Sequence, residues 1–255
     1  MARFKDGEMT PVSSEQSAQT DYSSAARALL RRARYGILST FSQQLPGFPF
    51  GSVVPCALTP NCEPILCISQ LAAHTQNIQA DPHVCLTVVE PNTSAETQTD
   101  GRFAYMGLVK PVPDTHLEAI RDRFLALVPS ARRYIGFGDF RLYTVRFEQG
   151  RFVGGFGKIS WIYPEPFAVA DPIAEAAIAH LAELNQLCRE ALDRFALGHN
   201  RSRAQLANVD SQGLDLRLED TVWRLEFPAD LNANATSVEA LAAIVTRQLD
   251  ANSTA

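Results

Sequence analysis

Short apolar runs separated by turn-forming residues occupy much of the first two thirds of the chain. Each run is rich in Val, Ile, Leu, Cys and Phe and is bounded by Gly, Pro, Asn or Asp, a pattern typical of strands rather than helices. A turn cluster, Thr-Pro-Asn-Cys, separates the second run from the third and favours an antiparallel hairpin there. The pattern predicts strands over residues 35–41, 51–58, 63–69, 84–90, 102–112, 139–147 and 151–157.

Helical periodicity marks fewer segments. Apolar residues recur every three or four positions over residues 23–34 and 114–128, and residues 70–81 hold good helix formers that end at Asp81-Pro82. A doubly wound sheet would need regular alternation of strands and helices, which this order lacks. We therefore expect a mainly β protein with α (α+β), in which six or seven antiparallel strands form a barrel with helices at its edges.

Composition divides the chain into three parts. Residues 1–20 are polar and rich in Ser, Gln and Thr, which predicts a disordered N-terminal tail. Three prolines within residues 163–172 are typical of a linker. These features predict a barrel domain over 21–165 and a small C-terminal α/β domain over 166–255, with helices over 173–195 and 238–249 and strands over 213–218 and 223–227.

Charge and composition argue against several classes of protein. The hydrophobic content of 46% and the charged content of 20% are those of a globular protein. A net charge of −5 gives no attraction to nucleic acid or to an acidic membrane. No apolar run approaches the ~20 residues that span a bilayer, and the first residues lack the apolar segment of a signal peptide. The charge and the lack of a spanning run lead us to expect no nucleic-acid or membrane partner. The odd number of cysteines and the absence of a Cys-x-x-Cys pair lead us to expect a reducing, cytoplasmic location.

The start of the helix predicted over residues 70–81 is a candidate binding site. The preceding strand ends at this point, so five polar residues gather at the beginning of a short helix. Free backbone N–H groups and the positive end of the helix dipole suit a bound phosphate there. His74 has the alternative role of a helix cap or a surface residue. The candidate phosphate ligands are Ser69, Gln70, His74, Thr75 and Asn77.

Several motifs, taken together, resemble a known superfamily. The runs GSVVP, ISQLAAHTQN and DFRLY, followed by RFVGGFGKISW, are similar to the haem-utilisation branch of the FMN-binding split-barrel superfamily, whose relatives include the pyridoxamine phosphate oxidases. The resemblance covers most of residues 25–165, and the C-terminal module is similar to the one that follows the barrel in this branch. It implies a six-stranded split barrel that forms a homodimer, with flavin or haem in the cleft between the subunits.

The same resemblance assigns roles to individual residues. It implies that the backbone of one strand faces the flavin ring, that Trp161 closes the cleft, and that Lys158 is the cation nearest to it in sequence. His74 and Thr75 stand where pyridoxamine phosphate oxidases have an Arg-Lys pair. Because charge-assisted hydrogen bonds are about twice as strong as neutral ones, the replacement predicts weak FMN binding. The implied ring-facing residues are Ser52, Val53, Val54 and Pro55.

The C-terminal module departs from its relatives at one motif. Haem-utilising relatives carry Met-Asn-x-Asp-His, whose histidine can ligate haem iron, whereas this chain has Leu-Asn-Gln-Leu-Cys ending at Cys188. A thiolate can also ligate haem iron. However, Cys188 falls on the apolar stripe of its predicted helix, so a buried structural cysteine is favoured.

Three functions remain open from the sequence. The first is a flavoprotein oxidoreductase that uses FMN and acts on a small unidentified substrate. The alternative is a haem- or tetrapyrrole-binding protein, or a haem-degrading one, in which haem occupies the same cleft. The third is a regulatory binding protein that keeps the fold without catalysis. The flavin interpretation is preferred at this point, with haem as the less favoured cofactor, no catalytic residue assigned and no metal site expected.

Overall fold

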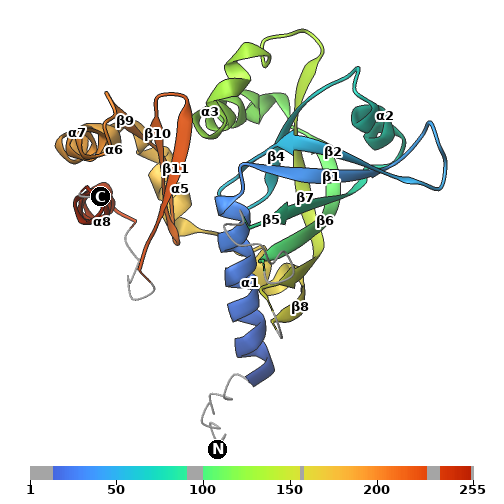
Figure 1. The fold of residues 1–255 in the computed structure, drawn as a ribbon, viewed down its shortest axis with the longest axis horizontal. Coiled ribbons are helices and arrows are strands. Elements are labelled where there is room, and N and C mark those ends of the chain that lie inside the picture. The colour runs from blue at the N-terminus through green and yellow to red at the C-terminus, as the bar shows by residue number, and fades with distance from the viewer. Residues whose placement is uncertain (1–13, 91–99, 156–157, 229–235, 254–255) are drawn as a thin grey trace, which may run out of the picture.

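The computed structural model describes residues 14–90, 100–155, 158–228 and 236–253. Figure 1 shows a curled β-sheet beside a smaller unit of helices and strands, with helix α1 (Ser14–Arg32) lying along the sheet on the side nearer the smaller unit. The predicted α+β class, a barrel followed by a C-terminal module, is confirmed. No helix in the described part of the chain is long and apolar enough to span a membrane.

The barrel sheet is antiparallel, and its described residues form eight strands rather than the six or seven predicted. The pairing order is β2-β1-β5-β6-β7-β4-β3, and β8 pairs with β7. The extra strands are the two-residue β3 and the hairpin strand β8, both of which a pattern based on long runs overlooks. The strands are β1 (Tyr35–Phe41), β2 (Pro49–Pro55), β3 (Ala57–Leu58), β4 (Pro64–Ser69), β5 (His83–Val89), β6 (Arg102–Pro111), β7 (Phe140–Val153) and β8 (Ile159–Ile162).

The sheet curls until its two ends lie over one core without joining. β2 and β4 are not paired in the described sheet, yet Val54 from β2 and Leu66 from β4 belong to the same buried cluster. That cluster also contains the fully buried rings of Phe103 and Tyr105. The open seam between β2 and β4 is the split of a split barrel.

The predicted hairpin between residues 51–58 and 63–69 is only partly correct. Within the first run, only β3 pairs with β4, with Ala57 opposite Ile65. β2 pairs instead with β1, from Tyr35 opposite Pro55 to Phe41 opposite Pro49. The chain changes partners at Pro55, which has no N–H to donate to a ladder.

The prediction of separate strands over 139–147 and 151–157 is wrong, because β7 runs through both. Gly150 lies in the middle of β7 against the ring of Phe103, where an added Cβ would come within 2.3 Å of that ring. Glycine therefore continues the strand at a close contact rather than ending it. After β7 the chain turns, with Gly154 N–H donating to the Lys158 carbonyl, and enters β8.

Helix α1 begins at Ser14, so residues 14–20 are helical and not part of a tail; residues 1–13 lie outside the described residues. Ala26, Leu29 and Leu30 bury one face of α1 in the barrel core. The helix extends beyond this apolar stripe because Gln19 donates a hydrogen bond to the Trp161 carbonyl of β8, at 2.8 Å. A contact between residues so distant in sequence leaves no local pattern.

Other helices close the barrel. Ile78 of α2 packs into the same core as α1, whereas Phe124 of α3 packs with Ile65 in a second cluster on the opposite surface of the sheet. The predicted linker at residues 163–172 contains a short helix whose Phe167 is buried in the barrel core, so this segment is packed. The helical elements are α2 (Ala73–Ala80), η1 (Asp114–His116), α3 (Leu117–Leu127), η2 (Pro129–Arg133) and α4 (Pro164–Phe167). Residues 91–100 are polar in sequence, and all of them except Asp100 lie outside the described residues.

The C-terminal module has its own core and a three-stranded sheet in the order β11-β10-β9. The single helix predicted over 173–195 is three helices, because the backbone leaves the helical region at His180 and Cys188. Strand β9 was not predicted; six of its seven residues are buried, so it lacks the alternation that marks a half-buried strand. The elements are α5 (Pro172–Ala179), α6 (Leu181–Leu187), α7 (Arg189–Gly198), β9 (Ala204–Asp210), β10 (Gly213–Leu218), β11 (Thr221–Glu226) and α8 (Val238–Ala251).

A buried network of charges joins α1 to the C-terminal module. The Arg31 guanidinium lies 2.6 Å from the Asp171 carboxylate and 3.0 Å from that of Asp210. The barrel core extends as far as Phe167, and the C-terminal core starts at Ile173. We propose that the boundary between the two domains, expected at residues 165 and 166, lies between these two core residues.

Candidate functional site

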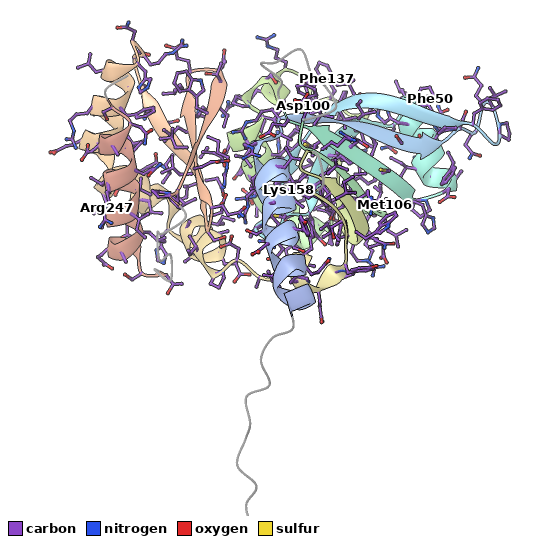
Figure 2. The ribbon with its side chains drawn as sticks, turned by 60° about the horizontal axis from the view of Figure 1, so that its bottom comes forward. Phe50, Asp100, Met106, Phe137, Lys158 and Arg247 are labelled. Atoms are coloured by element: carbon purple, nitrogen blue, oxygen red, sulfur yellow. The ribbon has the colours of Figure 1, made fainter. Side chains whose placement is uncertain are left out.

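One surface of the barrel, here called the outer face, exposes apolar side chains from strands β1, β2, β5, β6 and β8. Val53 is 71% exposed, and Tyr35, Ile37, Val89 and Trp161 are each at least 45% exposed. Large side chains of this kind are scattered on an ordinary surface, whereas a contiguous patch marks a binding site or an interface. Met106 of β6 shares this face with Ala104 by strand alternation, and Figure 2 places it on the side of the barrel remote from Arg247 of the C-terminal module.

Strand register brings the outer face together from distant parts of the sequence. A single row crosses the sheet because each residue lies opposite the next on the neighbouring strand. Its side chains point to the same surface, since strand residues alternate between the two faces. The row runs Val53, Ile37, Thr87, Ala104, Arg151 and Trp161.

Charge is unevenly distributed over the outer face. The sequence has no charged residue between Arg34 and Glu63, so β1 and β2 present an uncharged surface. At the opposite end, Arg102 and Arg151 point outward, and neither forms an ion pair within the described residues. The outer face is therefore uncharged on β1 and β2 and carries Arg102 and Arg151, neither in an ion pair among the described residues, at its β6–β8 end. Arg146, opposite Leu108 on the same face, is already paired with Glu148.

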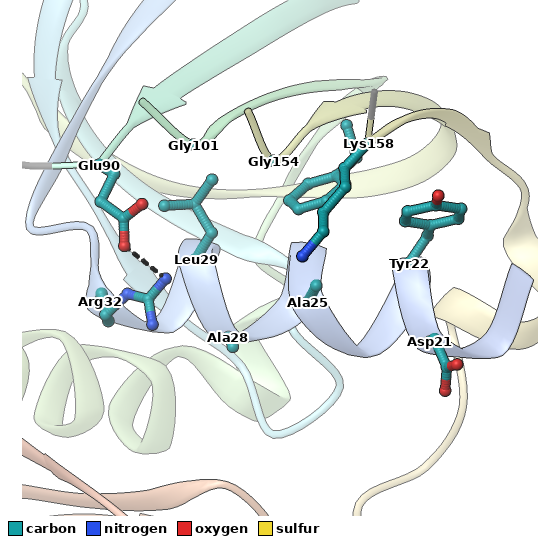
Figure 3. A pocket seen from close by; sticks show the side chains of 11 residues that line it. Asp21, Tyr22, Ala25, Ala28, Leu29, Arg32, Glu90, Gly101, Gly154 and Lys158 are labelled. Carbon is teal, nitrogen blue, oxygen red and sulfur yellow. Dashed lines mark ion pairs between the residues drawn. The ribbon is translucent and has the colours of Figure 1, made fainter. Parts of the chain in front are cut away.

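Trp161 and Lys158, both expected at the cleft, lie on different surfaces. The Arg151 guanidinium carbon lies 5.0 Å from the centre of the Trp161 ring, on the outer face. Lys158 lines a groove of about 570 Å³ against α1, with Tyr22 and Phe152. Figure 3 shows the Lys158 ammonium directed toward Ala25 of α1. The structure therefore does not place these two residues at one cleft.

The four residues expected to face a flavin ring also divide between surfaces. Val53 and Pro55 are exposed on the outer face, whereas Val54 is buried in the barrel core. Ser52 is half-buried and lies 3.2 Å from Nδ1 of His74. β2 is the first strand in the sheet order, so one edge of its backbone is unpaired in the described chain.

Ser69 and Gln70 lie at the end of β4, next to β7. The Ser69 hydroxyl donates to the Asp139 carboxylate and accepts from the Leu71 N–H at 3.1 Å. The Gln70 side chain donates to the Tyr143 hydroxyl at 2.8 Å. Both side chains therefore already have partners that hold β4 to the start of β7.

Thr75 and Asn77 are buried and hydrogen-bonded within the chain. The Thr75 hydroxyl donates to the Ser69 carbonyl at 2.6 Å. The Asn77 amide donates to the Thr40 hydroxyl at 2.9 Å and accepts from the Gln43 N–H at 2.9 Å. Buried polar groups need such partners, and these bonds lock α2 to the β1–β2 hairpin. These bonds give both residues a structural role, and the phosphate contacts expected from the sequence stay a prediction.

His74 is the one candidate phosphate ligand with an unsatisfied atom. Its Nε2 is buried and has no hydrogen-bond partner among the described residues. Burial lowers the pKa of His74, so the neutral imidazole is favoured at neutral pH. A neutral ring does not replace the charges of the missing Arg-Lys pair.

Cys188 is the buried structural cysteine favoured from the sequence. Its Sγ lies 3.6 Å from the Ala242 carbonyl and 3.7 Å from the Thr246 hydroxyl, so it packs α6 and α7 against α8. Burial raises the pKa of the thiol. Among the residues the structure describes, no group of three or more His, Cys, Asp or Glu side chains is arranged to hold a metal ion.

Reasoning from the sequence missed Arg102 and Arg151. Their local signal is an arginine at an alternate position of an otherwise apolar strand, in RFAYM and GRFV. The alternation predicts that the arginine and the following phenylalanine point to opposite surfaces. The pairing of β6 with β7, which makes the two arginines neighbours, is a long-range property that one sequence does not display.

Comparison with known proteins identifies the family. The model of the CREG β-barrel family matches residues 17–168, more than half of the chain. The chain belongs to this family. The split-barrel fold and its haem-utilisation branch, both expected from the resemblance, are thereby confirmed.

Similar proteins extend the match to the C-terminal module. The non-canonical heme oxygenase HOZ of Arabidopsis thaliana, a chloroplastic protein, is 30% identical over 230 residues, which are 84% of this chain and 69% of that protein. The structure of a heme binding protein from Mycobacterium smegmatis is 26% identical, with a TM-score of 0.56, over 91% of this chain and 97% of that one. A cytoplasmic location for this chain stays a prediction.

A second solved structure supports the fold alone. A protein of unknown function from Agrobacterium tumefaciens is 23% identical, with a TM-score of 0.68, over 92% of this chain and 99% of that one. The barrel and the C-terminal module therefore occur together in other proteins.

Proposed function

We propose that this protein binds haem, or a closely related tetrapyrrole, against the outer face of the barrel. The observation that carries the proposal is the outer face itself, an exposed apolar surface without charge on β1 and β2 and with two arginines at its other end. Haem has the matching chemistry, a flat apolar ring with two carboxylates on one edge. The relatives named for haem support the alternative raised from the sequence over the preferred flavin interpretation.

FMN suits the structure less well. Its phosphate would need donors at the start of α2, where the side chains of Thr75 and Asn77 are buried and already bonded within the chain. His74 is held neutral by burial, so no fixed positive charge remains among the residues expected to bind phosphate. Phosphate recognition commonly depends on such charges.

We further propose that a second copy of the chain covers the outer face, so that haem lies between two subunits. Uncharged apolar surface of this kind is typical of the buried centre of an interface. Two-fold pairing is the commonest assembly of identical chains. Light scattering at micromolar concentration should give the mass of two chains, and the mass of one chain would contradict the pairing.

Haem, when bound, would supply an iron atom whose reactivity depends on its ligands. The outer face carries sulfur and imidazole groups that can approach such an iron. Cys85 lies opposite Met106 across β5 and β6, and His83 precedes Cys85 by two residues on the same surface. Nδ1 of His83 lies 2.6 Å from the Asp81 carboxylate, which leaves Nε2 as its ligating atom.

Titration of the purified protein with hemin tests the proposal. We expect a saturable Soret band, whereas FMN and riboflavin should show little quenching of flavin fluorescence at the same protein concentration. Tight FMN binding without a Soret band would contradict the haem proposal and restore the flavin one.

Haem breakdown is a second candidate function, favoured by the 30% identity to a heme oxygenase across both modules. Its test is incubation of the haem complex with ascorbate and oxygen, in the presence of catalase to remove free peroxide. Loss of the Soret band with formation of a bilin-type absorption would support it. A stable Soret band over many hours would restrict the protein to haem binding.

A further inference from the structure

We propose that Arg102 and Arg151 bind the two carboxylates of the tetrapyrrole and that Trp161 holds Arg151 in position. This inference rests on the proposed haem function and adds to it the residues that determine which tetrapyrroles are accepted. The pair lies at the β6–β8 end of the outer face, where the apolar surface ends.

The stacking of Arg151 on Trp161 orients the guanidinium. The guanidinium carbon lies 5.0 Å from the centre of the indole ring, within the range of a cation–π contact. Such a contact occupies the flat surface of the guanidinium and leaves its N–H groups at the rim, where a carboxylate can accept two of them. Because Arg151 is half-buried and stacked, it loses less freedom on binding than a free arginine would.

Arg102 supplies the second cation at a suitable separation. Ala104 lies directly opposite Arg151 on the paired strands β6 and β7, and Arg102 lies two residues before Ala104 on the same surface. Arg102 and Arg151 are therefore diagonal neighbours, about 7–8 Å apart at their backbones. The flexible side chains can reach two carboxylates carried on one edge of a single ring system.

Nearby carboxylates have other partners. Glu90 follows the last residue of β5 but binds Arg32, at 3.0 Å, on the α1 side. Glu148 on β7 pairs with Arg146. Within the described ranges no carboxylate lies at ion-pair distance from Arg102 or Arg151, so both guanidinium groups are available to an anion.

The ligand class follows from this arrangement. The apolar part of the outer face and the two adjacent arginines favour a planar ring that carries two carboxylates on one side, as in haem and its metal-free porphyrin. A ring with esterified carboxylates would keep the apolar contacts and lose the charge-assisted bonds. Comparing the two rings therefore separates the contribution of the arginines to binding from that of the apolar surface.

The test compares the binding of hemin and of hemin dimethyl ester to wild type and to three variants. Binding is followed by the Soret band and by quenching of the fluorescence of a dye attached to the protein, so that the signal does not depend on tryptophan. The variants are Arg102→Ala, Arg151→Ala and, as a matched control, Arg146→Ala, an exposed arginine of β7 that is already paired with Glu148. Removing one charge-assisted contact should weaken hemin binding by roughly tenfold. The dimethyl ester should bind all the proteins equally, and Arg146→Ala should match wild type.

Two further variants separate charge from position. Arg151→Lys keeps the charge without the planar fork and should recover part of the hemin affinity. Trp161→Leu keeps an apolar residue and removes the stacking, so it should weaken hemin binding less than Arg151→Ala. Thermal unfolding of each variant checks that the fold is retained.

Equal losses of hemin and dimethyl ester binding would overturn the inference, since the arginines would then only shape the surface. Hemin binding that is unchanged in Arg102→Ala and Arg151→Ala would overturn it as well, while leaving the haem proposal intact. A wild-type protein that binds neither porphyrin would instead refute the haem proposal itself.

Discussion

At the scale of single residues, polar side chains that look like ligands in the sequence turn out to hold the fold. Asn77 shows this most clearly, because its amide bridges Thr40 of β1 and the backbone of Gln43 in the hairpin loop. Thr75, fully buried, closes the turn between β4 and α2. A polar residue at a helix start is compatible with either role, and only its burial and partners distinguish them.

Asn77→Ala should therefore lower stability rather than act on a cofactor alone. The substitution leaves the Thr40 hydroxyl and the Gln43 N–H without their partner, which costs about 1–3 kcal/mol for a buried group. The exposed neighbour Gln76 provides a control, and Gln76→Ala should change the free energy of unfolding by less than about 0.5 kcal/mol. Urea unfolding measures both. An Asn77→Ala protein as stable as wild type would show that these bonds contribute little.

At the scale of elements, α1 connects the two modules. One side of the helix buries Leu29 and Leu30 in the barrel, and the other directs Arg31 into the charge network of the C-terminal module. In that network Arg224 lies 2.8 Å from Asp210 and 3.1 Å from Asp215. Buried charges of this kind are costly to leave unpaired, so the network favours one relative position of the modules.

Stability should fall in acid because of the carboxylates in this network. Burial alone would raise the pKa of Asp171, but Arg31 and the Ser211 hydroxyl outweigh it and hold the pKa below its ordinary value of 3.8. Burial likewise opposes ionisation of Asp210, and Arg224 and Arg31 keep its pKa low. Because both groups bind protons more readily in the unfolded chain, their stabilisation is complete above about pH 4 and is lost as the pH falls below it.

Chemical unfolding between pH 7 and pH 3 checks this dependence with Asp171→Asn. Removing one partner of a buried pair costs about 3–5 kcal/mol at neutral pH, and part of the acid dependence should disappear with it. Asp250→Asn, in an exposed pair with Arg194, is the control and should cost no more than about 1 kcal/mol. Equal effects of the two substitutions would mean that the buried network does not hold the modules.

The sequence predicted those elements whose pattern is local. β1 and β10 were expected over the residues where they occur, because apolar and polar positions alternate along them or turn residues bound them. β9 was missed because burial on both surfaces removes the alternation. The contact that extends α1 to Ser14 and the breaks at His180 and Cys188 depend on packing between distant segments, which propensity does not encode.

The candidate site was less predictable than the fold. Resemblance to a family indicated the split barrel and, among the alternatives, haem. It drew attention to β2 and Trp161, of which Val53, Pro55 and Trp161 lie on the outer face, and to the start of α2, which is not part of that face. Ile37, Thr87 and Arg151 become neighbours only through strand register, so no local window of sequence contains the site.

At the scale of the whole molecule, the two modules differ in the surfaces that they offer to a ligand. The C-terminal module buries Cys188, the residue that replaces the histidine of haem-utilising relatives, and so offers no iron ligand at that position. The barrel, in contrast, exposes an apolar face with two available arginines. We therefore propose that haem binds to the barrel and that the C-terminal module holds α1 in place.

Hemin titration of Val53→Glu tests this central claim most directly. Val53 is 71% exposed at the centre of the uncharged part of the outer face, so a carboxylate there should be tolerated by the fold and disfavour an apolar ring. Leu197→Glu is the matched control, since Leu197 is an equally exposed apolar residue of the C-terminal module. We expect Val53→Glu to weaken hemin binding at least about tenfold, or 1.4 kcal/mol, while Leu197→Glu binds like wild type. Hemin affinity that is unchanged in Val53→Glu, in a protein with a normal unfolding temperature, would contradict it.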